Sequence, residues 1–144
     1  MPNICVVAVG ETSPHRIALE QALPRTVGEI MIAHPKTFPS DISVGDVRQA
    51  FGQNSHRVVL LLEGSAFRGA IDRGALDAEA PDGALAVAFA DRDVATVTPA
   101  TPLTDAVKLL ERSREPRLVV LDEDGCTLRG LLCFNRSSDS FCIR

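Results

Sequence analysis

The stretch RVVLLLEGSAFRGAI, residues 57–71, returns about sixty residues later as RLVVLDEDGCTLRGLL, residues 117–132. In both copies an Arg starts an apolar run, a polar turn containing Gly interrupts it, and Arg-Gly precedes two more apolar residues. Apolar runs on either side of such a turn indicate the two strands of a hairpin. Because residues 58–62 are all apolar, we expect that strand to be buried on both faces of its sheet.

The repeat extends upstream of the two hairpins. TFP at residues 37–39 matches TVT at 96–98, and VGDV at 44–47 matches LTDA at 103–106. The offset is 59 residues from Thr37 to Thr96 and 61 from Arg68 to Arg129, as small loop insertions would give. A period near sixty predicts two copies of one α/β unit, each with a sheet that is too small to hide its own apolar face. We expect the two sheets to pack face to face.

Helical periodicity lies between the strands of each copy. In the first copy Ser43 is the expected N-cap, and Val44, Val47 and Phe51 share one face. In the second copy Thr101 is the expected cap, before an apolar face made by residues 103, 106, 107 and 110. One further turn of helix is expected at residues 27–31, and RGALDA at residues 73–78 is expected to begin another helix.

These patterns divide the chain into four parts. Residues 1–25 are predicted to be an N-terminal strand and helix, with the strand at residues 3–10. Residues 26–78 form the first repeat and residues 92–144 the second. The Ala-rich segment between them, residues 79–91, is interpreted as a linker.

Composition excludes several classes of protein. The longest apolar run, residues 84–90, is far shorter than the roughly 20 residues of a spanning helix. No basic residue precedes the apolar run at residues 4–9, so no signal peptide is predicted and a cytoplasmic location is expected. With a net charge of −4, no Trp and no Tyr, the chain lacks the basic, aromatic surface of a nucleic-acid-binding protein.

Residue types that carry catalysis or bind metals are scattered. The four cysteines, which include Cys133 and Cys142, contain no CxxC pair, so neither a metal site nor a disulfide is predicted. Cys133 is expected to be partly buried, and Cys142 is expected to be the most reactive thiol. The three histidines lie in three separate segments, and no nucleophile–base pair is evident. We therefore expect a protein that is not an enzyme.

The segments TVGEIMIAHPKTFPSDISVGDVRQAF and VATVTPATPLTDAVKLLERS, each followed by its hairpin, resemble the cystathionine-β-synthase (CBS) domain. The tandem resembles a Bateman module and covers about residues 26–136. The resemblance implies an α/β (α+β) fold of two β-α-β-β-α repeats, packed as a pseudo-twofold sandwich that commonly forms dimers. It implies a regulatory role in which AMP, ATP or S-adenosylmethionine binds in clefts between the repeats.

The resemblance also implies where ligand residues would stand. After the Gly of each hairpin, ligand-binding members carry Thr or Ser for the phosphate and, three residues later, Asp for the ribose. Here those positions hold Asp72 and Ala75 in the first repeat, and Cys133 and Arg136 in the second, so neither residue type is kept. A carboxylate at Asp72 would repel a phosphate.

Two sets of cleft residues are therefore predicted. Thr37 and Asp72 belong to the first repeat. The second repeat, whose arginines suit an anion, is the one expected to bind if either does. Its predicted residues are Thr96, Arg117, Cys133 and Arg136.

Two functions remain open at this level. The chain is either a regulatory module that senses an adenosyl nucleotide or another anionic metabolite, or a nucleotide-independent module for dimerisation and partner docking. Under both hypotheses we expect a homodimer, because the apolar helix faces exceed what one sandwich can cover, and an unidentified protein effector.

Overall fold

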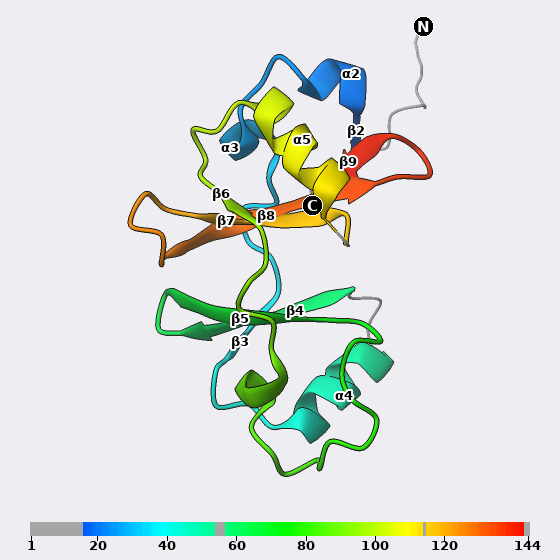
Figure 1. The fold of residues 1–144 in the computed structure, drawn as a ribbon, viewed down its shortest axis with the longest axis vertical. Helices are drawn as coiled ribbons and strands as arrows, with labels where there is room; N and C mark the ends of the chain where they lie inside the picture. Colours follow the sequence, from blue (N-terminus) through cyan, green and yellow to red (C-terminus); the bar gives the residue numbers. More distant parts are fainter. Residues whose placement is uncertain (1–15, 54–56, 114, 143–144) are drawn as a thin grey trace, which may run out of the picture. The chain divides into compact units, whose positions relative to one another are not determined.

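The structure is a computed structural model that describes residues 16–53, 57–113 and 115–142. Its contacts divide the chain into two units, each with one sheet (Figure 1). Unit 1 contains the described residues of Met1–Pro35, Ala95–Gly125 and Arg129–Arg144, and unit 2 contains those of Lys36–Val94 and Cys126–Leu128. The strand predicted at residues 3–10 lies outside the described residues.

Unit 2 is built on the first repeat. Its sheet has the order β3 (Thr37–Pro39), β4 (Val58–Glu63) and β5 (Ala66–Asp72), with β3 parallel and β5 antiparallel to β4. Helix α4 (Val44–Gln53) covers one face, and its amide of Asp46 donates to Ser43 Oγ at 3.1 Å, which confirms the predicted cap. The core contains buried Val44, Val47, Val59, Leu61 and Ile71.

Unit 1 holds the second repeat and the described N-terminal residues. Its five-stranded sheet has the order β2 (Arg16–Ala18), β9 (Ser140–Cys142), β8 (Leu128–Asn135), β7 (Arg117–Leu121) and β6 (Thr96–Val97). Helix α5 (Leu103–Arg112) lies along one face, near the short helices α2 (Leu19–Ala22) and α3 (Val27–Ile30) (Figure 1).

The repeat and its hairpins are confirmed. The order strand-helix-strand-strand appears as β3-α4-β4-β5 and as β6-α5-β7-β8. Residues 58–61 of β4 are all buried, so this strand is covered on both faces as its unbroken apolar run predicted. The mixed α/β class with two sheets is likewise confirmed.

The helix predicted at residues 73–78 is not formed. Gly74 has φ +85°, and the amide of Ala75 donates to the carbonyl oxygen of Asp72 at 3.0 Å, so the chain turns instead of continuing as a helix. Strand β5 is therefore followed by turns and, in the segment interpreted as a linker, by a single 3-10 turn, η1 (Ala86–Phe89), where the family pattern implied a second helix.

The second repeat ends in a strand rather than a helix. The side-chain oxygen of Asn135 accepts hydrogen bonds from the amides of Ser137 at 2.9 Å and Ser138 at 3.3 Å, which turns the chain back after β8. Strand β9 then pairs with both β8 and β2. Thr101 does not cap α5 either: its Oγ1 accepts from the amide of Thr98 at 3.1 Å, and Pro102 occupies the N-cap position.

The segment interpreted as a linker contributes to the core of unit 2. Ala80 and Ala86 are buried against the side chains of α4 and β4. The loop just before this segment is held by Arg48 of α4, which donates to the carbonyl oxygens of Asp77 at 2.8 Å and Ala78 at 3.1 Å. The proposed boundaries at residues 25, 78 and 91 stay predictions.

The Arg-Gly dipeptide recurs because, after each arginine, a glycine is needed where another segment of the chain crosses close to the strand. A Cβ on Gly69, which has φ +147°, would lie 2.7 Å from the Cβ of Ala90. A Cβ on Gly130 would lie 2.6 Å from the carbonyl oxygen of Ile32. In each unit the crossing segment forms an antiparallel β-bridge with the residue that follows the glycine. Asp91 pairs with Ala70, and Ile32 pairs with Leu131. The repeated phrase is therefore a packing requirement.

Candidate functional site

The face of the five-stranded sheet that points away from α5 gathers three of the predicted residues. Side chains that pack with α5 alternate along the strands: Val97, Leu118, Val120, Leu132 and Phe134. Because successive side chains of a strand point to opposite faces, the residue next to each of these points away from α5. Thr96 on β6, Arg117 on β7 and Cys133 on β8 therefore share that face.

Besides exposed Arg16, which pairs with Cys142 in the β2–β9 ladder, this face carries the charged group of Arg117. Its side chain is only 9% exposed, and its Nη1 lies 3.2 Å from Oε1 of Glu115. A guanidinium removed from water to this extent requires anionic or carbonyl partners. Thr96, by contrast, is exposed, and it pairs with Val119 in the parallel β6–β7 ladder.

Register places Cys133 beside Arg117. The amide of Phe134 donates to the carbonyl oxygen of Pro116 at 2.9 Å, so the next antiparallel pair along the ladder is Cys133 with Arg117. On its other side, Cys133 pairs directly with Cys142 of β9. Arg117, Cys133 and Cys142 thus form a row across three adjacent strands, and both cysteines are half-buried.

Arg136 does not join this row. It lies in the β8–β9 turn, and its Nη2 donates to the carbonyl oxygens of Leu110 at 3.2 Å and Ser113 at 2.9 Å. These carbonyls lie at the C-terminal end of α5, on the opposite side of the sheet from Arg117. The structure therefore brings together three of the four residues predicted for the second repeat.

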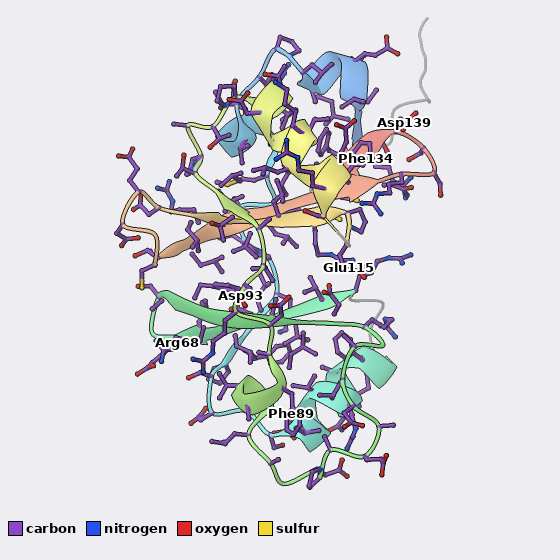
Figure 2. All side chains as sticks on the ribbon, viewed as in Figure 1. Arg68, Phe89, Asp93, Glu115, Phe134 and Asp139 are labelled. Atoms are coloured by element: carbon purple, nitrogen blue, oxygen red, sulfur yellow. The ribbon has the colours of Figure 1, made fainter. Side chains whose placement is uncertain are left out.

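The Arg136 side chain borders a small hollow of unit 1. The hollow has a volume of about 200 Å³, and its lining is mainly apolar. Phe134 and Asp139, labelled in Figure 2, come from the β8–β9 hairpin. The remaining lining residues are Leu19, Val107, Leu110 and Glu111.

The two residues predicted for the first repeat also share a sheet face. Thr37 pairs with Leu60, and Asp72 pairs with Val58. Since Val59 and Leu61 pack with α4, Thr37 and Asp72 lie on the face that points away from that helix. Both are half-buried, and they flank β4 from its two sides. In the repeat alignment Thr37 corresponds to Thr96 and Asp72 to Cys133, so the sheet of unit 2 carries a carboxylate where the sheet of unit 1 carries a thiol.

Other chemistry is limited in the described parts of the chain. Among residues 16–53, 57–113 and 115–142, no group of three or more His, Cys, Asp or Glu side chains could hold a metal ion. No helix in these ranges is both long and apolar enough to cross a membrane. His15 and His56 lie outside the described residues.

The sequence did not predict that Cys142 lies beside Cys133. Cys142 lies in a short polar tail, SSDSFC, whose composition gives little sign of a strand. Only the reversal at Asn135 and the pairing of Phe134 with Phe141 set the register. The alternation of Phe141 and Cys142 after a Ser-rich turn was the one available signal.

Comparison with known proteins identifies the fold. A protein-family model described as the CBS domain matches residues 86–134. No curated protein matches the sequence.

Among solved structures, the chain is similar to CBSX2 from Arabidopsis thaliana in complex with AMP. The TM-score is 0.69 at 22% identity, covering 80% of this chain and 92% of that one. It is also similar to a CBS domain-containing protein from Bacillus anthracis, with a TM-score of 0.66 at 14% identity, covering 83% and 93% of the two chains. A CBS domain pair/ACT domain protein from Thermotoga maritima has a TM-score of 0.62 at 18% identity, covering 74% and 87%.

Proposed function

Because this chain belongs to the CBS-domain-pair (Bateman module) proteins, we propose that it is a regulatory module that binds an anionic metabolite of the adenine-nucleotide type. The proposed binding surface is the face of the unit 1 sheet that carries Thr96, Arg117 and Cys133. The role is non-catalytic: occupancy of this face would alter how the chain engages a protein effector.

One observation carries the proposal. Arg117 is a nearly buried cation of this face, and its Nη1 forms an ion pair with Glu115, whose side chain is 44% exposed. A carboxylate that accessible to water can exchange with a ligand phosphate, which a guanidinium holds through charge-assisted hydrogen bonds. The AMP complex of CBSX2 supports the choice of ligand class.

The ribose should contribute little to recognition. The positions that the family resemblance assigns to a ribose-binding carboxylate hold Ala75 and Arg136, and Arg136 is engaged by the end of α5. Neither residue supplies an acceptor for two hydroxyl groups. We therefore expect the phosphate, rather than the nucleoside, to dominate the affinity.

Calorimetry with AMP, adenosine and inorganic phosphate tests the proposal on the whole chain. We expect AMP to bind and adenosine to bind weakly or not at all. Arg117→Gln should weaken AMP binding by about tenfold or more, since a hydrogen bond to a charged group contributes ~1.5–3 kcal/mol. The matched control is Arg112→Gln at the exposed end of α5, which removes the same charge outside the proposed face.

Two outcomes would contradict the proposal. AMP and phosphate could both fail to bind, or Arg112→Gln could weaken AMP binding as much as Arg117→Gln does. A thermal melt of each variant, recorded first, shows that loss of binding does not reflect loss of the fold.

A docking function is the second candidate, and one observation favours it. Leu85 and Phe89 of unit 2 are 53% and 41% exposed, unusual for large apolar side chains four residues apart. Such a pair suits a protein contact, including a second copy of the chain. Sedimentation of the wild type and of a Leu85→Ser, Phe89→Ser double variant tests this: a dimer that dissociates in the variant supports it, whereas a wild-type monomer of 15.4 kDa contradicts it.

A further inference from the structure

We propose that Cys133 and Cys142 are a thiol–disulfide exchange site, which reacts with a low-molecular-weight disulfide such as oxidised glutathione to form a reversible cross-strand bond. The two residues are directly opposed in the antiparallel β8–β9 ladder, and both are thiols in the structure. This inference is independent of nucleotide binding.

Strand geometry brings the two thiols within reach of each other. The amide of Phe134 points toward Pro116 on the β7 side, so the amides of its neighbours in β8 point toward β9. Cys133 and Cys142 are therefore a hydrogen-bonded pair, with Cα atoms about 5.5 Å apart. This separation falls within the roughly 4.4–6.8 Å that disulfides span.

Side-chain direction also favours the bond. Phe134 and Phe141, the next pair along the ladder, both pack toward α5 with ring centroids 4.9 Å apart. Cys133 and Cys142 consequently point together to the other face, where both are half-buried and accessible to a small reagent. Their Cβ atoms, about 5 Å apart in such a pair, must approach to about 4 Å, so the strands must close slightly.

The exchange is balanced in two steps. The thiolate of one cysteine attacks a sulfur of the small disulfide, whose S–S bond breaks to release one thiol and leave a mixed disulfide on the protein. The thiolate of the other cysteine then attacks the protein sulfur and expels the second small thiol. Two protein thiols lose two electrons in total, the reagent gains them, and the two cysteine protons end on the released thiols. Arg117, in the same row, is a favourable neighbour for a thiolate.

The bond would fix the hairpin that completes unit 1. Strand β9 holds the edge strand β2, and the β8–β9 turn carries the arginine that closes α5. Linking β9 to β8 would restrain both connections. Oxidation would therefore stabilise this end of unit 1, and reduction would release it.

Trypsin separates the cysteines, which makes the test direct. Cleavage after Arg129 and Arg136 places Cys133 in residues 130–136 and Cys142 in residues 137–144. Cys126 falls in residues 118–129 and Cys5 in residues 1–16. The whole native chain is equilibrated with mixtures of oxidised and reduced glutathione, quenched in acid, alkylated and digested without reduction.

We expect the peptides 130–136 and 137–144 to be joined, with a mass two hydrogens below their sum, and to separate when reduced glutathione is in excess. Cys126→Ser should form the same linked pair. Cys142→Ser should instead retain glutathione on residues 130–136. The native strand register holds the two thiols close together, and urea removes this advantage. The ratio of oxidised glutathione to the square of reduced glutathione that oxidises half of the protein should therefore be at least several-fold higher in urea than for the native protein.

The proposal is overturned if the two peptides carry glutathione separately or remain unmodified in the wild type. It is also overturned if either cysteine links mainly to residues 1–16 or 118–129. Equal half-oxidation ratios in the native and urea-unfolded protein would show that the β8–β9 register contributes nothing.

Discussion

The guanidinium of Arg136 donates to the carbonyl oxygen of Leu110 at 3.2 Å, across 26 residues of sequence. The same Nη2 reaches the carbonyl oxygen of Ser113 at 2.9 Å. Carbonyls in the last turn of a helix have no partner within the helix, and a cation there also interacts favourably with the helix dipole. Arg136 therefore joins the β8–β9 turn to the end of α5.

Replacing this arginine should lower stability more than ligand affinity. We expect Arg136→Ala to reduce the free energy of unfolding by about 1–2 kcal/mol, because two hydrogen bonds to helix-terminal carbonyls are lost. Urea denaturation of wild type and variant measures the change. Arg112→Ala is the matched control, since that exposed arginine also lies at the end of α5 but has no side-chain hydrogen bond described in the structure. Equal stabilities for wild type and Arg136→Ala would contradict the capping role.

The crossing at Gly130 gives a sharper stability test. In Gly130→Ala the new methyl group would stand 2.6 Å from the carbonyl oxygen of Ile32 and 2.8 Å from Sδ of Met31, so the crossing segment must move. We expect a loss of about 1–3 kcal/mol, the usual range for overpacking. Thermal melts and urea titrations measure it.

Gly52 is the control for that substitution. It lies near the end of α4, and a Cβ there would meet nothing within 4 Å. Because alanine is favoured over glycine in helices by about 0.5–1 kcal/mol, Gly52→Ala should be neutral or slightly stabilising. If both substitutions destabilise the chain equally, close approach at Gly130 is not what requires its glycine.

Local signals in the sequence were sufficient for the hairpins and for helices α4 and α5. The run at residues 58–62 and the turn glycines are contiguous, so their pattern can be read without knowing the fold. Strand β9 in the C-terminal tail could not be predicted in this way, because its own residues carry little strand pattern. It is a strand through its pairing with β8 and with β2, and β2 is far away in the sequence. The absence of a helix at residues 73–78 depends on the positive φ of Gly74.

In the candidate site, too, some features could be predicted from the local sequence and others could not. Strand alternation alone places Thr96, Arg117 and Cys133 on one face once the strands are known. Residue type could not decide the role of Arg136, because a guanidinium suits both a phosphate and a row of helix carbonyls. The choice is made by the turn after Asn135, which aims the side chain at α5.

The start of α3 should give unit 1 a component of acid sensitivity. The pKa of Glu29 is lowered below its ordinary value, chiefly because its carboxylate accepts a hydrogen bond from the backbone amide of Thr26 at 3.0 Å. Desolvation opposes this shift, whereas the Thr26 hydroxyl and the charge of Arg25 reinforce it. A depressed folded-state pKa stabilises the fold above the unfolded-state pKa, and that contribution is lost as pH falls through the folded-state value.

Glu29→Gln tests this linkage because it keeps the shape and removes the charge. We expect the variant to be less stable than wild type at pH 7, and the two to converge as pH falls through the lowered folded-state pKa, where the glutamate becomes protonated. Urea titrations at a series of pH values measure the difference. A difference that stays constant from pH 7 to pH 3 would show that the ionised carboxylate contributes nothing specific.

The last prediction concerns Arg48, which holds the loop of residues 77–82 on α4. It donates to the carbonyl oxygens of Asp77 and Ala78 and forms an ion pair with the Asp82 carboxylate. The loop in turn supplies the carbonyl oxygen of Asp82, which accepts from the amide of Gly45 at 2.9 Å near the start of α4. We expect Arg48→Met, which keeps the aliphatic volume, to destabilise unit 2 by about 1–3 kcal/mol, because the bonds to both backbone carbonyls are lost.

Asp82→Asn separates the ion pair from the backbone bonds. The Asp82 side chain is 75% exposed, so its charge should contribute no more than about 1 kcal/mol. Hydrogen exchange at the Gly45 amide reports directly on the loop, because this amide bonds to it. We expect exchange there to accelerate several-fold in Arg48→Met and to change little in Asp82→Asn. If Asp82→Asn accelerates exchange as much as Arg48→Met, the loop is held by the surface ion pair and not by the two carbonyl bonds.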